Sequence, residues 1–264
     1  MMRRHAITVA CLLLLGLALV PVSAGAEQIG IVFLHGKQGT PDSPQLALVT
    51  GRLQDAGYLV EKPEMCWSQT RIYDQTLADC MAAVDAALAR LRSRGATSVI
   101  VAGHSLGGFG AIYYGSTHDG LRAVVAIAPA PGPRAARRPE IAASIARAQT
   151  LVAQGQGDVA QSFTDANTHE TTFLIEVHAT PKVFLSFYDA GAGGSLAENA
   201  AKLRAPVLWV SGTRDPTQAD HKTSYIRAPA NPLNRLIELD AEHMETPDKA
   251  AQQIVDWIKT LPPQ

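Results

Sequence analysis

Charged and aromatic residues are scarce in this sequence. Only 18% of its 264 residues are charged, 6% are aromatic, and the formal net charge at pH 7 is -1. Nucleic acids and anionic membranes recruit dense positive charge, so this balance predicts neither as a partner. With 47% hydrophobic residues, the composition is typical of a globular protein with a sizeable core and excludes a disordered chain.

Cysteine is rare as well, and the cysteines and histidines lie scattered without the short spacings of zinc sites. The glycines form neither a phosphate loop nor a dinucleotide fingerprint. We therefore expect no metal and no cofactor. Cys66 and Cys80 are candidates for a disulfide in an oxidising compartment. The bond would close a loop of 15 residues, which is worth roughly 3 kcal/mol; two buried free thiols are the alternative.

Long apolar runs are missing except at the N-terminus. There Arg3 and Arg4 precede the apolar stretch 6–20, and small residues up to Ala26 follow it, as in a secretory signal peptide. A membrane anchor is the alternative, but 15 apolar residues fall short of the ~20 that cross a bilayer. We predict a signal peptide over 1–26 with cleavage near Ala26, which changes the charge from -1 to -3. The mature chain is expected to be periplasmic or secreted, without a membrane span.

Apolar β-type runs alternate with helical periodicity through most of residues 27–264. The runs expected as strands are 29–34, 58–61, 97–102, 121–128, 207–210 and 235–239. Helical spacing covers residues 44–56, 74–93 and 248–261, and a helix-like run follows Gly107. This alternation predicts an α/β fold, a mostly parallel sheet with helices on both faces. Ligands bind at the carboxyl ends of such strands.

Residues from 130 to about 200 interrupt the alternation. Prolines at 131, 133 and 139 open this segment, and residues 141–152 have helical spacing. Residues 183–188 within it resemble a β-strand. We predict a small, mainly helical cap inserted into the domain over the strand ends.

Ser105 stands in the pattern Gly103-x-Ser105-x-Gly107, after a β-branched run and before a helix-like run. This context is typical of a nucleophile elbow, where a sharp turn holds the serine in a strained conformation above the sheet. Small neighbours allow the strand and the helix to approach closely. A serine in an ordinary turn is the alternative, and the flanking runs disfavour it.

A serine hydroxyl is a weak nucleophile and needs a base, and the base needs an orienting acid. His243 follows the last expected strand and precedes the final helix, so we assign it as the base. Asp215 follows the strand 207–210 and is the candidate acid. Asp189 is its serious rival; the weaker candidates are Asp220, Asp240 and Glu242.

An oxyanion needs preformed N–H donors. We expect one from the amide of Leu106, next to the nucleophile at a helix N-terminus. The other is expected from the loop after the first strand, where Lys37 is the first choice and Gln38 the second. Gln38 and Trp67 are also candidates to line a substrate pocket, although Trp67 fits a half-buried loop position equally well. His35 and His104 are interpreted as structural residues.

These motifs together resemble the α/β-hydrolase superfamily, in an exported, esterase- or lipase-like form. The resemblance rests on His35-Gly36, on Gly103 through Gly108, on 206–215 and on His243. It implies an α/β-hydrolase fold and a serine hydrolase that cleaves a small or medium carboxylic ester through an acyl-enzyme, without a cofactor. A thioesterase or an amidase or peptidase would use the same side chains. A catalytically silent binding protein on this fold is the alternative of another class.

Overall fold

A computed structural model describes residues 27–130, 138–189, 191 and 193–263. The predicted signal peptide and the prolines at 131 and 133 lie outside the described residues. Within the described ranges, no helix has the length and apolar character that crossing a membrane requires.

The centre of the domain is a six-stranded sheet with the order β2-β1-β3-β4-β7-β8. Every neighbouring pair in it is parallel, which confirms the predicted α/β sheet. Each strand lies at or within about three residues of a predicted apolar run. The strands are β1 (Ile29–Leu34), β2 (Leu59–Glu61), β3 (Ser98–His104), β4 (Ala123–Ile127), β7 (Val207–Gly212) and β8 (Arg235–Leu239).

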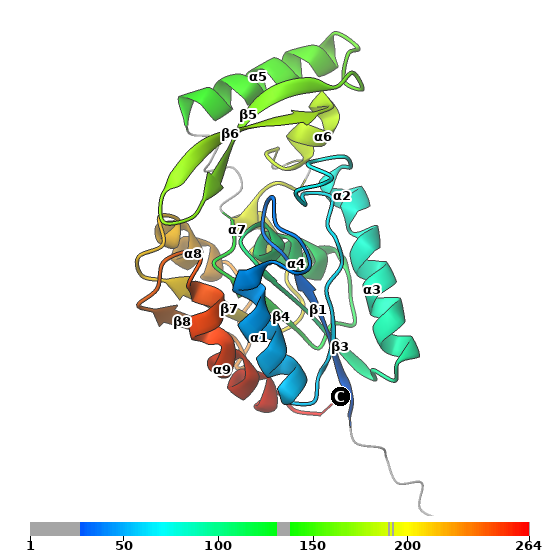
Figure 1. Cartoon of the computed structure of the whole chain (residues 1–264), viewed down its shortest axis with the longest axis vertical. Helices are drawn as coiled ribbons and strands as arrows, with labels where there is room; N and C mark the ends of the chain where they lie inside the picture. The colour runs from blue at the N-terminus through cyan, green and yellow to red at the C-terminus, as the bar shows by residue number, and fades with distance from the viewer. Residues whose placement is uncertain (1–26, 131–137, 190, 192, 264) are drawn as a thin grey trace, which may run out of the picture.

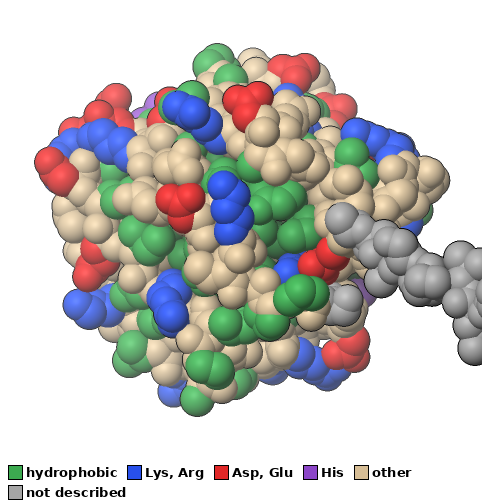
Figure 2. All heavy atoms as spheres, turned by 90° about the horizontal axis from the view of Figure 1, so that it is seen from below, with side chains coloured by type: hydrophobic (Ala, Val, Ile, Leu, Met, Phe, Trp, Pro, Cys, Tyr) green, Lys and Arg blue, Asp and Glu red, His purple; other side chains and the backbone are tan. Residues whose placement is uncertain are grey.

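Helices cover both faces of the sheet, because side chains alternate along each buried strand. Ile31 and Phe33 of β1 pack toward α1 (Pro44–Asp55) and α9 (Thr246–Lys259), which lie side by side (Figure 1). Val32 and Leu34 share the other core with residues of α3 (Ala82–Ser93) and α4 (Leu106–Thr117). The end of the molecule opposite the cap mixes acidic and basic side chains (Figure 2). A smaller helix, α8 (Gln218–Tyr225), follows β7.

The prediction of one continuous helix over 74–93 is wrong, because the structure has two helices there. Thr76 caps a short helix α2 (Leu77–Cys80), its hydroxyl accepting the Asp79 amide, and α3 begins only after Met81. A side-chain oxygen that satisfies an amide at a helix start fixes where the helix begins. Cys80, at the end of α2, is tied to Cys66, so the first turn is anchored to another loop.

Within the described ranges, the insertion between β4 and β7 has more helix than strand, as predicted, but it also contains a β-hairpin that the sequence did not reveal. It contains α5 (Pro139–Ala153), the antiparallel strands β5 (Gln161–Thr168) and β6 (Thr172–Ala179), and the helices α6 (Pro181–Ser186) and α7 (Leu196–Ala200). Its helix α5 and the hairpin lie beyond one end of the main sheet (Figure 1). The hairpin escaped detection because β5 is largely polar, with Phe163 and Ala166 as its only apolar members.

The β-like interpretation of residues 183–188 is also wrong. Thr180 accepts the Val183 amide at 3.3 Å, and Pro181 occupies the first helical position of α6. A cap followed by proline favours a helix start. These signals outweigh the β-propensity of the apolar residues that follow.

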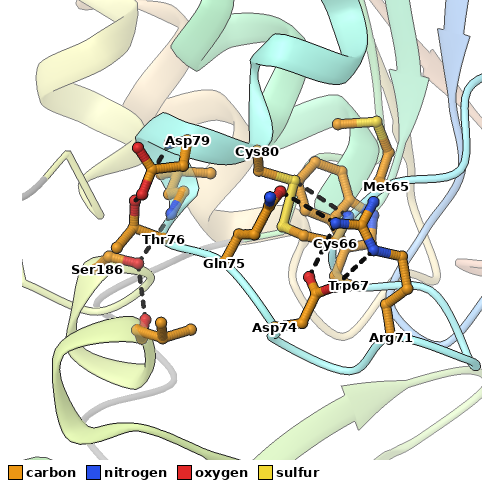
Figure 3. The surroundings of a disulfide bond; sticks show 12 residues. Met65, Cys66, Trp67, Arg71, Asp74, Gln75, Thr76, Asp79, Cys80 and Ser186 are labelled. Carbon is orange, nitrogen blue, oxygen red and sulfur yellow. Dashed lines mark hydrogen bonds and ion pairs between the residues drawn. A yellow bond between two sulfur atoms is a disulfide. The ribbon is translucent and has the colours of Figure 1, made fainter. Parts of the chain in front are cut away.

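A disulfide joins Cys66 and Cys80, whose Cα atoms are 5.7 Å apart. Figure 3 shows the bond beside Trp67 and the ion pair of Arg71 with Asp74. Both cysteines are buried. The bond therefore fixes the long loop between β2 and α2 to the core.

We expect reduction to lower the free energy of unfolding by about 3 kcal/mol, because a 15-residue loop in the unfolded chain loses its constraint. Urea titrations with and without reductant measure the difference. A Cys66→Ser/Cys80→Ser variant is the control and should not respond to reductant. Two reactive thiols in the unreduced, denatured protein would contradict the prediction.

Candidate active site

Ser105 occupies a sharp turn between β3 and α4, with φ 57° and ψ -122°. A Cβ on Gly103 would lie 2.3 Å from the Gly107 carbonyl oxygen, and a Cβ on Gly107 would lie 2.2 Å from the Leu34 carbonyl oxygen. Only glycine fits at either position. The two glycines of the motif are therefore required by the contact of strand, helix and the neighbouring strand β1. The strained serine is the geometry expected of the elbow.

The structure brings Ser105, His243 and Asp215 together in one hydrogen-bonded row. The Ser105 hydroxyl donates to His243 Nε2 at 2.9 Å, and His243 Nδ1 donates to Asp215 Oδ2 at 2.7 Å. All three side chains are buried. The rival acid Asp189 is exposed in the cap, where its carboxylate accepts the Gly191 amide at 2.9 Å.

Burial alone would raise the pKa of the Asp215 carboxyl, but hydrogen bonds and positive charge outweigh it. The hydrogen bond from His243, the charges of His243 and His221, and the Thr217 hydroxyl together lower this pKa to about 2. Thr217 donates to Asp215 Oδ1 through its hydroxyl at 2.6 Å and through its amide at 2.7 Å. Asp215 is thus ionised at neutral pH and can hold His243 in the Nδ1–H tautomer.

His221 is a residue that the sequence interpretation left without a role. It lies on α8, four residues after Thr217, and is completely buried. Its Nε2 is 3.1 Å from the Pro129 carbonyl and 3.0 Å from the Thr217 hydroxyl, while Nδ1 is 2.7 Å from Ser211 Oγ. A carbonyl only accepts, so Nε2 carries the proton. The spacing of Thr217 and His221 is the signal that could have shown this network.

His104 contacts His243, the proposed base. Its Nε2 donates to the His243 carbonyl at 3.0 Å, and the two rings are 4.8 Å apart. Burial, followed by the charge of His243, lowers the pKa of His104 to about 3. Burial is also the main cause that lowers the pKa of His221 to about 4. Both rings are therefore neutral and serve as hydrogen-bonding supports.

The loop after β1 comes close to the nucleophile. A Cβ on Gly36 would lie 3.2 Å from Ser105 Cβ, so glycine is what permits this approach. The Gln38 amide already donates to the Trp67 carbonyl at 2.9 Å, whereas within the described ranges the Lys37 amide donates to no protein acceptor. The Leu106 amide is at the first position of α4, where helices leave their N–H groups open.

Two pockets meet at Ser105. The first is a cavity of about 190 Å³ with an aromatic wall of Tyr73, Phe187 and Tyr188. The second is lined by Gln38 and other amide side chains together with His169, Phe173 and Met244. Of the two residues predicted to line a pocket, Gln38 does so.

The prediction that Trp67 lines a pocket is not supported. Its side chain is 1% exposed and its Nε1 donates to the His35 carbonyl at 2.8 Å. Its ring packs edge-on against Phe187 and tightly against Gly110. Trp67 therefore supports the loop after β1 from inside the core.

The parallel sheet, the strained elbow and the order of serine, acid and histidine along the chain define an α/β hydrolase. A family model described as serine aminopeptidase, S33, matches residues 68–231, more than half of the sequence. The chain belongs to this family and is a serine hydrolase.

Several solved structures share the fold at low sequence identity. One was described with the metagenome-derived lipolytic enzymes LipS and LipT: 18% identity, 87% of this chain and 91% of that chain covered, TM-score 0.62. A monoacylglycerol lipase of Paleococcus ferrophilus gives 21% identity, 88% and 95% coverage, and a TM-score of 0.65. Est1E of Butyrivibrio proteoclasticus, with ferulic acid bound, has 14% sequence identity and a TM-score of 0.60; the match covers 91% of this chain and 92% of that chain. No curated protein matches the sequence.

The neutral histidines predict an acid-sensitive fold. In the unfolded chain they bind protons below about pH 6.5, whereas in the folded chain the pKa of His221 is about 4 and that of His104 about 3. The pKa of His35 is lowered too, chiefly by burial. The unfolded state therefore binds more protons below pH 6.5, and stability should fall steadily as the pH drops from 6.5 toward 4.

Urea unfolding at several pH values measures this slope. In His221→Gln, we expect about one proton fewer to be taken up on unfolding near pH 5. An unchanged slope in His221→Gln would contradict the prediction.

Proposed function

We propose that this hydrolase cleaves carboxylic esters of small or medium size through an acyl-enzyme on Ser105. The observation that carries the proposal is the continuous hydrogen bonding from Asp215 through His243 to Ser105 at the junction of two pockets. No cofactor is needed for this chemistry, since the base, the acid and the amide donors all come from the chain.

In the proposed reaction the Ser105 oxygen attacks the ester carbonyl while His243 Nε2 takes the hydroxyl proton. Asp215 stabilises the imidazolium that forms. The amides of Leu106 and Lys37 hold the oxyanion. His243 then gives the proton to the departing alcohol, and a water molecule, activated by the same base, releases the acid and restores the hydroxyl.

The walls of the first pocket favour a compact acyl group. Charge does not select the substrate there, because the Lys37 ammonium is paired with Asp165, and Arg138 and Asp220 carry opposite charges. The aromatic wall and the small cavity suit a short or aromatic acyl group. The esterase and lipase names of the structural neighbours agree with an ester substrate.

The second pocket suits the alcohol part of the ester. Met244 lines it directly after His243, the residue that must protonate the leaving oxygen. The amide groups of Gln38, Gln45 and Gln69 offer both donors and acceptors. We infer that the alcohol is neutral and forms hydrogen bonds.

We also propose that the protein works outside the cytosol, as its N-terminal sequence predicts. The disulfide between Cys66 and Cys80 supports this location, because such bonds persist in oxidising compartments.

Ser105→Ala should fold normally and lose activity on aryl esters by several orders of magnitude; triad losses elsewhere reach about 10⁶-fold. A fluorophosphonate probe should label the wild type at Ser105 and leave the variant unlabelled. Circular dichroism of both proteins controls for folding. Failure of the well-folded wild type to react would point to the silent binding protein instead.

The specificity constant should be greatest for short-chain and aromatic acyl esters. We expect it to fall by at least about tenfold for long acyl chains, since each misplaced methylene costs about 1–3 kcal/mol of transition-state binding. A series of nitrophenyl esters from acetate to decanoate tests this, with aryl thioesters and amino-acid nitroanilides as comparisons. Preference for the anilides would contradict the ester assignment and favour an aminopeptidase.

A further inference from the structure

Asp165 is a completely buried carboxylate on the cap strand β5, outside the hydrogen-bonded row of Ser105. Its Oδ2 accepts from Lys37 Nζ at 2.6 Å and from the Tyr73 hydroxyl at 2.9 Å. Its Oδ1 accepts from the Ala166 amide at 2.6 Å and from the Tyr188 hydroxyl. Both oxygens are thus saturated by donors from the core loops and from the cap.

Lys37 reaches this carboxylate from the loop after β1. Its side chain is 12% exposed, and its ammonium also donates to the Ala166 carbonyl at 2.6 Å. The same ammonium lies 5.8 Å from the centre of the Tyr73 ring. The described contacts of the Lys37 ammonium are therefore with the cap strand and with Tyr73.

The protonation of Tyr73 is consistent with this arrangement. Burial, and then the negative charge of Asp165, raise the pKa of Tyr73 well above its usual value. Tyr73 stays protonated and donates to Asp165. The cluster therefore holds one buried anion and one cation, with two hydroxyl donors.

The backbone beside Lys37 is restrained on one side, because the Gly36 carbonyl, in the same peptide unit as the Lys37 amide, accepts from His35 Nδ1 at 2.8 Å. Lys37 adds a side-chain restraint. Its neighbours are tied by the bonds of Gln38 to Trp67 and of Gly39 to Gly36, while within the described ranges the Lys37 amide bonds to no protein group. The flanking glycines Gly36 and Gly39 leave the chain freedom to turn. The side chain thus adds the restraint that ties the amide assigned to the oxyanion to the cap.

We propose that Asp165 is a positioning residue, which fixes the Lys37 amide for the oxyanion by binding the Lys37 ammonium onto the cap. This inference rests on the proposed function and extends it. Amide donors stabilise an oxyanion only when they are held in place before the reaction. The cap, which is far from Lys37 in sequence, would then complete the site as well as cover it.

The same cluster connects the oxyanion loop to the acyl pocket. Tyr73 and Tyr188, which both donate to Asp165, line the aromatic wall of the first pocket. A shift of Asp165 would therefore change the pocket wall and the Lys37 loop together. Binding of the acyl group and placement of the oxyanion donor therefore depend on the same residue, Asp165.

Lys37→Met and Asp165→Asn test the proposal. Met keeps the backbone amide and the apolar stem of Lys37, and Asn keeps the shape of Asp165. In each variant we expect kcat on p-nitrophenyl acetate to fall about ten- to a hundredfold, less than the 10²–10³-fold loss of a whole oxyanion donor. KM on this ester should change by no more than about threefold, because its acetyl group is too small to depend on the aromatic wall and its ground state makes little use of the donor. The double variant should lose no more activity than the worse single variant, since both changes remove one interaction.

A transition-state analogue separates positioning from a general structural effect. Phenylboronic acid forms a tetrahedral adduct with an active serine, so its inhibition constant should weaken in parallel with kcat/KM. Asp158→Asn is the matched control, because Asp158 forms an exposed ion pair with Lys182 of the same cap at 2.7 Å. This control should keep wild-type kcat and boronate affinity.

Unchanged kcat and boronate affinity in folded Lys37→Met and Asp165→Asn would overturn the inference, and so would equal losses in Asp158→Asn. If Lys37→Met fails to fold, the isosteric Asp165→Asn decides alone. The proposed function fails on a different result, namely wild-type protein that neither reacts with fluorophosphonate nor hydrolyses any ester. The two failures are therefore distinguishable.

Discussion

The close contact of three backbone segments at the elbow is the constraint on which the rest of the site depends. Gly107 lies so near the Leu34 carbonyl that no side chain fits, and Gly103 lies equally near Gly107. This contact sets the height of Ser105 above the sheet. It also brings the end of β1, and hence the loop of Lys37, beside the nucleophile.

The turn at Ser105 is surrounded by one ionised carboxylate, Asp215, and two neutral histidines, His104 and His221. Asp215 remains ionised because the hydrogen bonds from His243 and Thr217 help to outweigh the cost of burial. His104 and His221 remain neutral because burial dominates there. His104 and His221 therefore add hydrogen bonds without a second fixed charge, and among the described residues Asp215 is the buried anion that contacts the proposed base.

Local sequence patterns were sufficient for much of this arrangement. The sheet followed from apolar runs with helices between them, and the positions of Ser105, Asp215 and His243 followed from chain order, because parallel strands end at one edge. The cap hairpin was missed since a polar strand packed on one side has little apolar alternation. Trp67 was misplaced because an aromatic in a loop has no periodic signal for burial. The contact of Lys37 with Asp165 spans 128 residues, a separation that no local pattern can bridge.

The disulfide has a consequence for where the active conformation can form. Cys66 adjoins Trp67, whose indole holds the His35 carbonyl and whose own carbonyl holds the Gln38 amide. The disulfide thus restrains the segment of Cys66 and Trp67 that contacts the loop of Lys37. In a molecule that folded with free thiols, the turn at Ser105 would be unchanged, but the residues that contact the Lys37 loop would be less constrained. Formation of the disulfide would then help to position the proposed oxyanion donor and would also stabilise the fold.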